Sequence, residues 1–295
     1  MKTGSPPSAV GFVGLGVMGA PMAQNMARKF RVVGFDVQAA RFGAAGSVQR
    51  AASAGEVARS CDVVCLSLPS AAVVEQVVLA DGGLTETLRD GSLLIDLSTS
   101  LPAVSRRIAS RLAERGVQFA DAPVSGGEKG AKEASLAIMV GASEAAFARC
   151  RPILEAIGKT AVRVGEVGAG NIAKLVNNMI VAAEFAVIAE GFALAGRGGV
   201  DARLLYDAMR EGWAGSKVLD VSAEAVLSAN YAPGGTINMM EKDLGYAREL
   251  AAEGQVPIPM TAAAHELFVA GQASGRGALA QPAVLELWRA RRDQA

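Results

Sequence analysis

A short apolar segment followed at once by three spaced glycines sets the strongest constraint on how this chain folds. Residues 9–13 read Ala-Val-Gly-Phe-Val, and the next residues follow the pattern Gly-x-Gly-x-x-Gly. This order predicts a strand, a tight turn and a helix, which is the fingerprint of a Rossmann dinucleotide-binding fold. The first glycine allows the turn, the second lets a pyrophosphate approach the backbone, and the third lets the helix pack closely. The residues predicted to contact the cofactor are Gly14, Gly16, Val17, Met18 and Gly19.

A second predicted strand ends in an acidic residue. Residues 31–36 read Arg-Val-Val-Gly-Phe-Asp, so Asp36 lies 17 positions after Gly19. A carboxylate there can accept both hydroxyls of the adenosine ribose, and it would repel the 2′-phosphate of NADP. Because Val37 follows rather than an arginine, the sequence predicts NAD. The alternative is that Arg41, one helical turn further on, holds the phosphate of NADP.

Predicted strands and helices alternate through the first half of the chain. Apolar runs over residues 62–68 and 93–97 predict strands, and the patterns over 73–79 and 108–115 predict helices. Such alternation predicts a parallel, doubly wound α/β sheet that binds ligands at the carboxyl ends of its strands. The residues expected to line the ribose and nicotinamide there are Leu68, Pro69, Ser70, Ser98 and Thr99. The alternative is that they are ordinary turn and capping residues.

Another strand end carries a serine and two glycines. The segment that begins at Gln118 breaks at Pro123 and then reads Val-Ser-Gly-Gly, which contains Ser125, Gly126 and Gly127. A hydroxyl beside glycine amides that no side chain covers can receive a carboxylate or a phosphate. The segment is therefore a candidate anion site, and the alternative is a simple glycine turn.

After Gly170 the strand signals nearly disappear and helical periodicity continues to the end. This change predicts a Rossmann domain over residues 1–167 and an all-helical domain over 168–295. The second domain opens with a long apolar helix from Asn171 to about Gly196, which we expect to be largely buried. Such a helix suggests an interdomain spine or a subunit interface, so a homodimer or homotetramer is expected. Further helices are predicted over 201–209, 218–227, 243–253 and 261–270.

Composition narrows the range of partners. Lys+Arg and Asp+Glu both number 29, so the balance gives no electrostatic reason to expect nucleic acid or membrane binding. We find neither an uninterrupted apolar stretch of roughly 18 to 20 residues nor an apolar signal core in residues 1–9, and a cytoplasmic location is expected. Cys61, Cys65 and Cys150 lack a CxxC pair and are expected to lie in the core. The single histidine, His265, excludes a His-rich metal site, and no metal is expected.

Four motifs give the chain a family resemblance over nearly its whole length. They occupy residues 14–19, 121–127, 168–178 and 242–244. With them the sequence resembles the β-hydroxyacid dehydrogenases, the group of 3-hydroxyisobutyrate dehydrogenase, tartronate semialdehyde reductase and threonate dehydrogenase. The resemblance implies a Rossmann domain, an all-helical domain and an active site between them.

The resemblance also implies roles for individual residues. Lys174 would be the general acid/base, and Asn178, on the same helical face, would orient it or the substrate. The residues implied to bind the substrate are Ser125, Gly126, Gly127, Trp213 and Lys242, the last of them also lying near the nicotinamide. One departure is that Ala280 and Pro282 stand where relatives tend to carry Asp and Ser in a segment that closes the pocket.

These roles agree with the chemistry of alcohol oxidation. A base must remove the hydroxyl proton while the carbinol carbon gives hydride to nicotinamide. Lys174 can serve if burial and a second cation such as Lys242 lower its pKa from about 10.4. A carboxylate held at Ser125 would then select an acid whose alcohol lies one carbon beyond the α-carbon.

The sequence therefore predicts NAD-dependent oxidation of a small 3-hydroxy acid to its semialdehyde, or the reverse reduction. One alternative is an NADPH-dependent reductase of small aldehydes, and another is a non-catalytic nucleotide-binding sensor. The short-chain type, with Tyr-x-x-x-Lys, is excluded because Arg210, Gly235 and Leu250 stand four places after the three tyrosines. A lactate-type mechanism would need His265, which lies in a helical region.

Overall fold

The computed structural model describes residues 7, 9–232 and 234–289. The chain divides into two compact units, Met1–Lys174 and Leu175–Ala295, and each is described by itself. Most of the N-terminal stretch in which no signal core was found lies outside the described residues.

A nine-stranded sheet forms the centre of the first unit, in the order β3-β2-β1-β4-β5-β6-β8-β7, with β9 beside β8. The strands are β1 (Ala9–Val13), β2 (Arg31–Phe35), β3 (Gln49–Arg50), β4 (Val63–Leu66), β5 (Leu93–Asp96), β6 (Gln118–Asp121), β7 (Val124–Ser125), β8 (Leu136–Gly141) and β9 (Gly158–Gly165). From β3 to β6 all neighbours are parallel, whereas β8 runs antiparallel to β6 and β7. The predicted parallel, doubly wound sheet is therefore confirmed, with an antiparallel extension that the sequence did not predict.

Helices cover this sheet on both faces. They are α1 (Gly19–Ala27), α2 (Ala54–Ser60), α3 (Ala71–Leu79), α4 (Leu84–Thr87), α5 (Pro102–Ala113), α6 (Gly127–Lys132) and α7 (Glu144–Leu154). Val10 and Phe12 of β1 pack in one core with Met22 of α1 and Ile153 of α7. Gly11 points to the opposite face, where a Cβ would lie 2.5 Å from the side chain of Val57 in α2.

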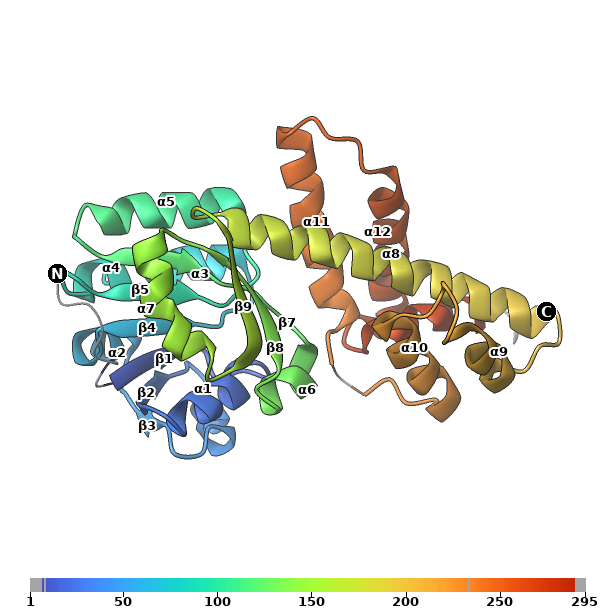
Figure 1. The fold of residues 1–295 in the computed structure, drawn as a ribbon, viewed down its shortest axis with the longest axis horizontal. Helices are drawn as coiled ribbons and strands as arrows, with labels where there is room; N and C mark the ends of the chain where they lie inside the picture. The colour runs from blue at the N-terminus through green and yellow to red at the C-terminus, as the bar shows by residue number, and fades with distance from the viewer. Residues whose placement is uncertain (1–6, 8, 233, 290–295) are drawn as a thin grey trace. The chain divides into compact units, whose positions relative to one another are not determined.

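The second unit is helical. It contains most of α8 (Ala169–Arg197), then α9 (Ala202–Met209), α10 (Lys217–Ser228), α11 (Ile237–Glu253) and α12 (Pro259–Gly271), followed by the short α13 (Glu286–Arg289). Figure 1 shows α8 as one continuous helix. The fold is thus a Rossmann-like sheet domain followed by a helical domain, as the sequence predicted. One helix start was wrong: α11 begins at Ile237, capped by Thr236, and not at Asp243.

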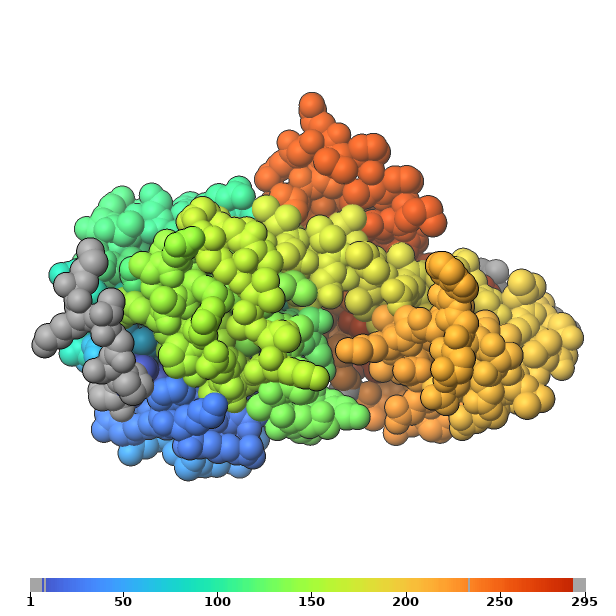
Figure 2. Space-filling model, in the orientation of Figure 1, coloured from blue at the N-terminus to red at the C-terminus, as the bar shows by residue number. Residues whose placement is uncertain are grey.

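The long helix α8 has the predicted length but is only partly buried. Ala182, Phe185, Ala189 and Phe192 form one buried stripe in the core of the second unit. Figure 2 shows the yellow segment of α8 at the molecular surface. Its exposed apolar side chains are Val176, Ile180, Val187 and Leu194. The expected burial on all sides is therefore wrong for a single chain, and the expected homo-oligomer stays a prediction.

By length and composition alone, α8 could cross a membrane. Its mean hydropathy reaches 1.8 over an 18-residue window. Asn178 and Glu184 lie within it, so its apolar residues do not form an uninterrupted stretch. The core helix of a soluble protein passes the same test, so this single helix is weak evidence for a membrane span.

Candidate active site

The glycine turn after β1 has the geometry that the fingerprint predicts. Gly14 has a φ of +94°, and a Cβ there would lie 2.2 Å from the carbonyl oxygen of Ser67. A Cβ on Gly19 would lie 1.9 Å from the carbonyl oxygen of Gly14, so only glycine lets α1 start this close to β1. Among the described residues, no side chain caps the N-terminal amides of α1, whose preceding residue is Met18. These amides and the exposed Val17 border a turn that fits a dinucleotide pyrophosphate.

Asp36 lies directly after β2 and is 7% exposed. Its Oδ2 accepts the N–H of Leu15 and its Oδ1 accepts the N–H of Gln38, both at 2.7 Å. Arg41 Nη1 lies 3.6 Å from Asp36 Oδ2. The same nitrogen would lie 3.0 Å from a Cβ on Gly16. A carboxylate and a guanidinium therefore both stand at the glycine turn, where the adenosine ribose of a dinucleotide would lie.

Hydrogen bonds of Ser98 connect the carboxyl ends of β4 and β5. Ser98 Oγ accepts the N–H of Leu68 at 2.9 Å, while the N–H of Ser98 donates to Asp96 Oδ1 at 2.9 Å. Ser70 caps α3 by accepting the N–H of Val73, so the alternative of a capping residue is confirmed for Ser70. Pro69 is exposed and Thr99 is half-buried at these strand ends, and their contact with a cofactor stays a prediction.

The candidate anion site lies between β7 and α6. Ser125 ends β7, and Gly126 precedes the first residue of α6, Gly127. Both glycines are exposed, with φ values of +136° and +62°, respectively. Among the described residues, no atom would lie within 4 Å of a Cβ on Gly127. The backbone at Gly127 is therefore uncovered, and anion binding by this loop stays a prediction.

Lys174 lies in the second turn of α8 and is 9% exposed. The first turn of that helix is tied to the end of β6. Asp121 accepts the N–H of Gly168 at 2.7 Å and the N–H of Asn171 at 2.8 Å. Sequence reasoning named Asp121 only as part of a motif and assigned it no role.

A second group of polar residues lies in the helical unit. Asn178, 6% exposed, donates from Nδ2 to Asp243 Oδ2 at 2.7 Å and accepts from Asn177 at 3.0 Å. Lys242 Nζ lies 2.8 Å from Asp243 Oδ1 and 4.8 Å from the ring centre of Tyr246. Asp243 therefore links two of the predicted site residues. Its only signal in the sequence was its place in the motif at 242–244.

Trp213, Ala280 and Pro282 make none of the hydrogen bonds described for this polar group among the described residues. Trp213, between α9 and α10, has a fully exposed side chain, and its contact with a substrate stays a prediction. Pro282 is buried, and Ala280 bridges to Thr236, so the segment that departs from the family pattern is part of the packed unit.

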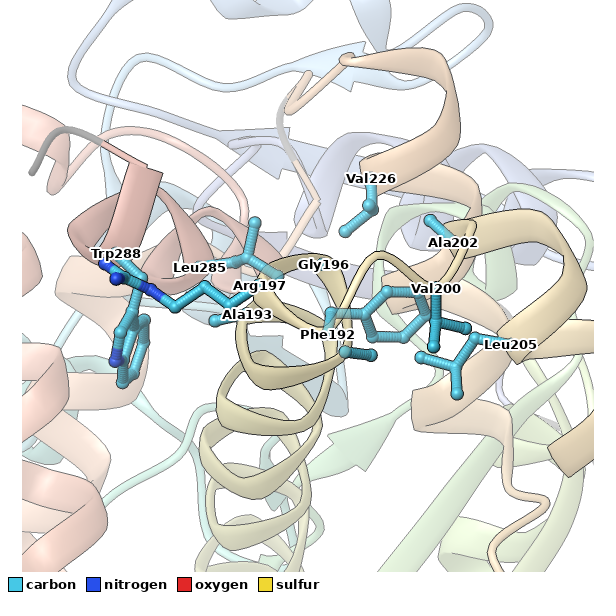
Figure 3. Close-up of a pocket in the computed structure, with 11 residues that line it drawn as sticks. Phe192, Ala193, Gly196, Arg197, Val200, Ala202, Leu205, Val226, Leu285 and Trp288 are labelled. Atoms are coloured by element: carbon cyan, nitrogen blue, oxygen red, sulfur yellow. The ribbon is translucent and has the colours of Figure 1, made fainter. Parts of the chain in front are cut away.

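A cavity of about 150 Å³ lies near the end of α8. Figure 3 shows Phe192, Arg197, Val200 and Trp288 among its lining residues. Its lining contains none of the predicted site residues.

The remaining candidates have structural surroundings. His265 in α12 is buried between Arg248, whose Nη1 lies 3.0 Å from Nδ1, and Glu241, whose Oε1 lies 3.4 Å from Nε2. Because arginine can only donate, Nδ1 accepts a hydrogen bond from Arg248. Both ring nitrogens of His265 therefore contact charged side chains. The three cysteines are free and buried, as expected for core residues.

Two family models together match almost the whole described chain. Residues 9–168 match the NAD binding domain of 6-phosphogluconate dehydrogenase. Residues 168–288 match a model described as NAD-binding of NADP-dependent 3-hydroxyisobutyrate dehydrogenase. The first match covers the sheet and the glycine turn, and the second covers the helical unit.

Curated relatives and solved structures agree with these models. The chain is 37% identical over 283 residues to 2-(hydroxymethyl)glutarate dehydrogenase of Eubacterium barkeri, which covers 95% of this chain and 94% of that one. It is 34% identical over 280 residues to 2-hydroxy-3-oxopropionate reductase of Escherichia coli, with coverage of 94% and 96%. A structure of 3-hydroxyisobutyrate dehydrogenase with L-serine from Mycobacterium tuberculosis matches with a TM-score of 0.86 and 32% identity, covering 96% and 99% of the two chains. The glycine turn, the buried lysine and these matches together make the chain a member of the β-hydroxyacid dehydrogenase family, an NAD(P)-dependent oxidoreductase that acts on the CH–OH group of small hydroxy acids.

Proposed function

We propose that the protein oxidises a small 3-hydroxy carboxylic acid to its semialdehyde with NAD, or catalyses the reverse reduction, with Lys174 as general acid/base. The observation that carries this proposal is the environment of Lys174. An ammonium-bearing side chain that is 9% exposed stands on a helix whose first turn is bonded to the strand leading into the Ser125–Gly127 loop. Oxidation of a hydroxy acid requires a base for the hydroxyl proton and a site that fixes the carboxylate. The end of β6 connects to both of these parts.

The residues of this chain would act in sequence on the substrate. Ser125 Oγ and the backbone N–H groups of Gly126 and Gly127 bind the carboxylate and fix which hydroxyl reaches Lys174. Lys174 takes the hydroxyl proton during oxidation and returns it during reduction. When bound, the nicotinamide accepts or supplies the hydride. The glycine turn of residues 14–19 binds its pyrophosphate and holds it at the ends of the strands.

Asn178 would act on the proton-transfer group or on the substrate oxygen. Its Nδ2 donates to Asp243 at 2.7 Å, which fixes the plane of the amide. With the amide plane fixed, the second hydrogen of Nδ2 and the carbonyl Oδ1 each have a fixed direction for further hydrogen bonds. We propose that Asp243 orients Asn178 and neutralises Lys242, whose Nζ lies 2.8 Å away.

The preference for NAD rests on Asp36. Its carboxylate is buried at the glycine turn and keeps lone pairs for ribose hydroxyls after accepting two backbone N–H groups. A 2′-phosphate would have to approach this anion closely. The observation that favours the NADPH-dependent alternative is Arg41, 3.6 Å from the same carboxylate, which could pair with a phosphate after turning outward.

The test is a panel of substrates assayed with both cofactors. Initial rates would be measured for 3-hydroxyisobutyrate, L-serine, glycerate, threonate and 2-(hydroxymethyl)glutarate, and for short semialdehydes, each with the NAD and the NADP couple. We expect turnover of at least one 3-hydroxy acid with NAD. A 2-hydroxy acid such as lactate is the matched control and should not react, because its alcohol lies one carbon too close to the carboxylate. Turnover with NADPH alone would support the reductase alternative.

A further inference from the structure

Asp121 is a fully buried carboxylate that the mechanism does not use. It is the last residue of β6, where it pairs in register with Asp96 of β5. Its Oδ1 accepts the N–H of Gly168 at 2.7 Å, and its Oδ2 accepts the N–H of Asn171 at 2.8 Å. Gly168 directly precedes α8 and Asn171 lies in its first turn, so Asp121 caps the helix that carries Lys174.

Asn171 completes this connection with its side chain, which is fully buried. Its Oδ1 accepts the N–H of Ser100 at 2.8 Å, and its Nδ2 donates to Ser105 Oγ at 3.1 Å. Ser100 directly follows Thr99, a residue predicted to lie at the nicotinamide. The first turn of α8 is therefore bonded to the end of β6 and to the segment after β5.

Two glycines let this helix start press against the sheet. A Cβ on Gly170 would lie 2.4 Å from the carbonyl oxygen of Asp121 and 2.6 Å from that of Met139. A Cβ on Gly141 of β8 would lie 2.4 Å from Asp121 Oδ1. The position of the helix start is thus set by direct backbone packing together with the carboxylate.

Asp96 and Asp121 form a buried pair of carboxyl groups whose acidities differ. Burial raises the pKa of Asp96 to about 7 and that of Asp121 to about 6. Oδ2 of Asp96 has no hydrogen-bond partner among the described residues, whereas both oxygens of Asp121 accept backbone N–H groups and Arg106 lowers its pKa. Asp121 is therefore the more acidic of the two carboxyl groups, and the dipole of α8 favours a negative charge at its position.

We propose that Asp121 and Asn171 are positioning residues for Lys174: they hold the first turn of α8 so that the ammonium group one turn later is aligned with the Ser125–Gly127 loop on the same chain segment as Asp121. This inference rests on the proposed function of Lys174. It deepens that function by naming the residues through which the sheet sets the place of the base.

The test compares Asp121→Asn with a control that loses a helix cap elsewhere. Asn keeps one acceptor oxygen but turns an N–H₂ group toward one of the two backbone donors. Ser143→Ala is the control, because Ser143 Oγ caps α7 by accepting the N–H of Ala146 at 3.2 Å and α7 carries no predicted site residue. Both variants should lower the Tm.

Two readouts separate positioning from stability. We expect kcat of Asp121→Asn to fall about 10- to 100-fold while the Kd for NAD stays unchanged, because a small displacement of a base slows the chemical step without changing cofactor binding. The rate of acetylation of Lys174 by acetic anhydride, followed by peptide mass spectrometry, should rise about tenfold as the first turn loosens. Ser143→Ala should change neither quantity.

The second readout needs no turnover, so it separates this proposal from the proposed function. If the wild type turned over none of the substrates in the panel, the proposed function would be wrong. The acetylation rates would still decide whether Asp121 positions Lys174. Unchanged kcat and unchanged acetylation in folded Asp121→Asn would overturn the positioning role, as would equal losses in Ser143→Ala. If Asp121→Asn does not fold, Asn171→Ala, which removes the bonds to Ser100 and Ser105, is judged by the same two readouts.

Discussion

At the scale of single residues, the choice of cofactor depends on two opposite charges at the glycine turn. Replacing Asp36 with Asn keeps an acceptor for one of the two backbone N–H groups that Asp36 binds, and it removes the negative charge. We expect the ratio of kcat/KM with NADP to that with NAD to rise about tenfold or more, since each 1.4 kcal/mol of relieved repulsion corresponds to a factor of ten. Initial rates at varied cofactor concentrations measure this ratio.

Arg41→Ala is the matched variant for this prediction. If Arg41 only neutralises Asp36, its loss should make the preference for NAD stronger. A wild type that already prefers NADP, and loses that preference in Arg41→Ala, would contradict the assignment of Asp36 as the selecting residue.

Asp96 gives a prediction about stability and pH. Its pKa is raised from 3.8 to about 7 by burial, so between these values the folded state holds a proton that the unfolded state has lost. The contribution of Asp96 to the free energy of unfolding is therefore full below about pH 4 and is lost as the pH rises through about 7. Asp96→Asn removes this dependence.

The Tm of Asp96→Asn minus that of the wild type should therefore increase between pH 5 and pH 8. Thermal unfolding of both proteins at the two pH values measures it. A difference that stays constant across this range would show that Asp96 titrates normally in the folded protein.

At the scale of elements, two of the three glycines of α8 should respond in opposite ways to substitution by alanine. A Cβ on Gly170 would lie 2.4 Å from the carbonyl oxygen of Asp121, so Gly170→Ala forces the helix away from β6. We expect a loss of about 1 to 3 kcal/mol in the free energy of unfolding, measured by urea titration.

Gly191→Ala in the same helix is the control. Apart from neighbouring backbone of the same helix, no atom of the described residues would lie within 4 Å of its Cβ. The higher helix propensity of alanine should leave the stability unchanged or raise it by about 0.5 to 1 kcal/mol. Equal losses in both variants would contradict the close packing of the helix start.

At the scale of the whole molecule, local sequence patterns predicted individual helices and strands better than they predicted strand pairing and helix burial. The strand, glycines and helix at residues 9–27 were predicted because turn chemistry and apolar runs are local signals. The antiparallel β7 escaped because Val124 and Ser125 form a strand of only two residues. The expected burial of α8 was wrong because apolar composition does not show which faces of a helix the rest of the chain packs against.

The candidate site shows the same division. Lys174, Asn178 and the Ser125–Gly127 loop were named from motifs. Asp121 and Asp243 were missed as partners because their bonds join residues 47 and 65 positions apart, and no spacing in the sequence encodes such a pairing. Buried hydrogen-bond partners of this kind are visible only once the chain is folded.

In the proposed reaction, Lys174 moves the proton while a 3-hydroxy acid gives up its hydride. The most direct test is Lys174→Ala, assayed for turnover with the best substrate of the panel and, by titration, for NAD binding. We predict that kcat falls about 10²- to 10⁴-fold while the Kd for NAD remains that of the wild type, because the glycine turn and Asp36 are left intact. A variant that binds NAD normally and turns over at the wild-type rate would contradict this account.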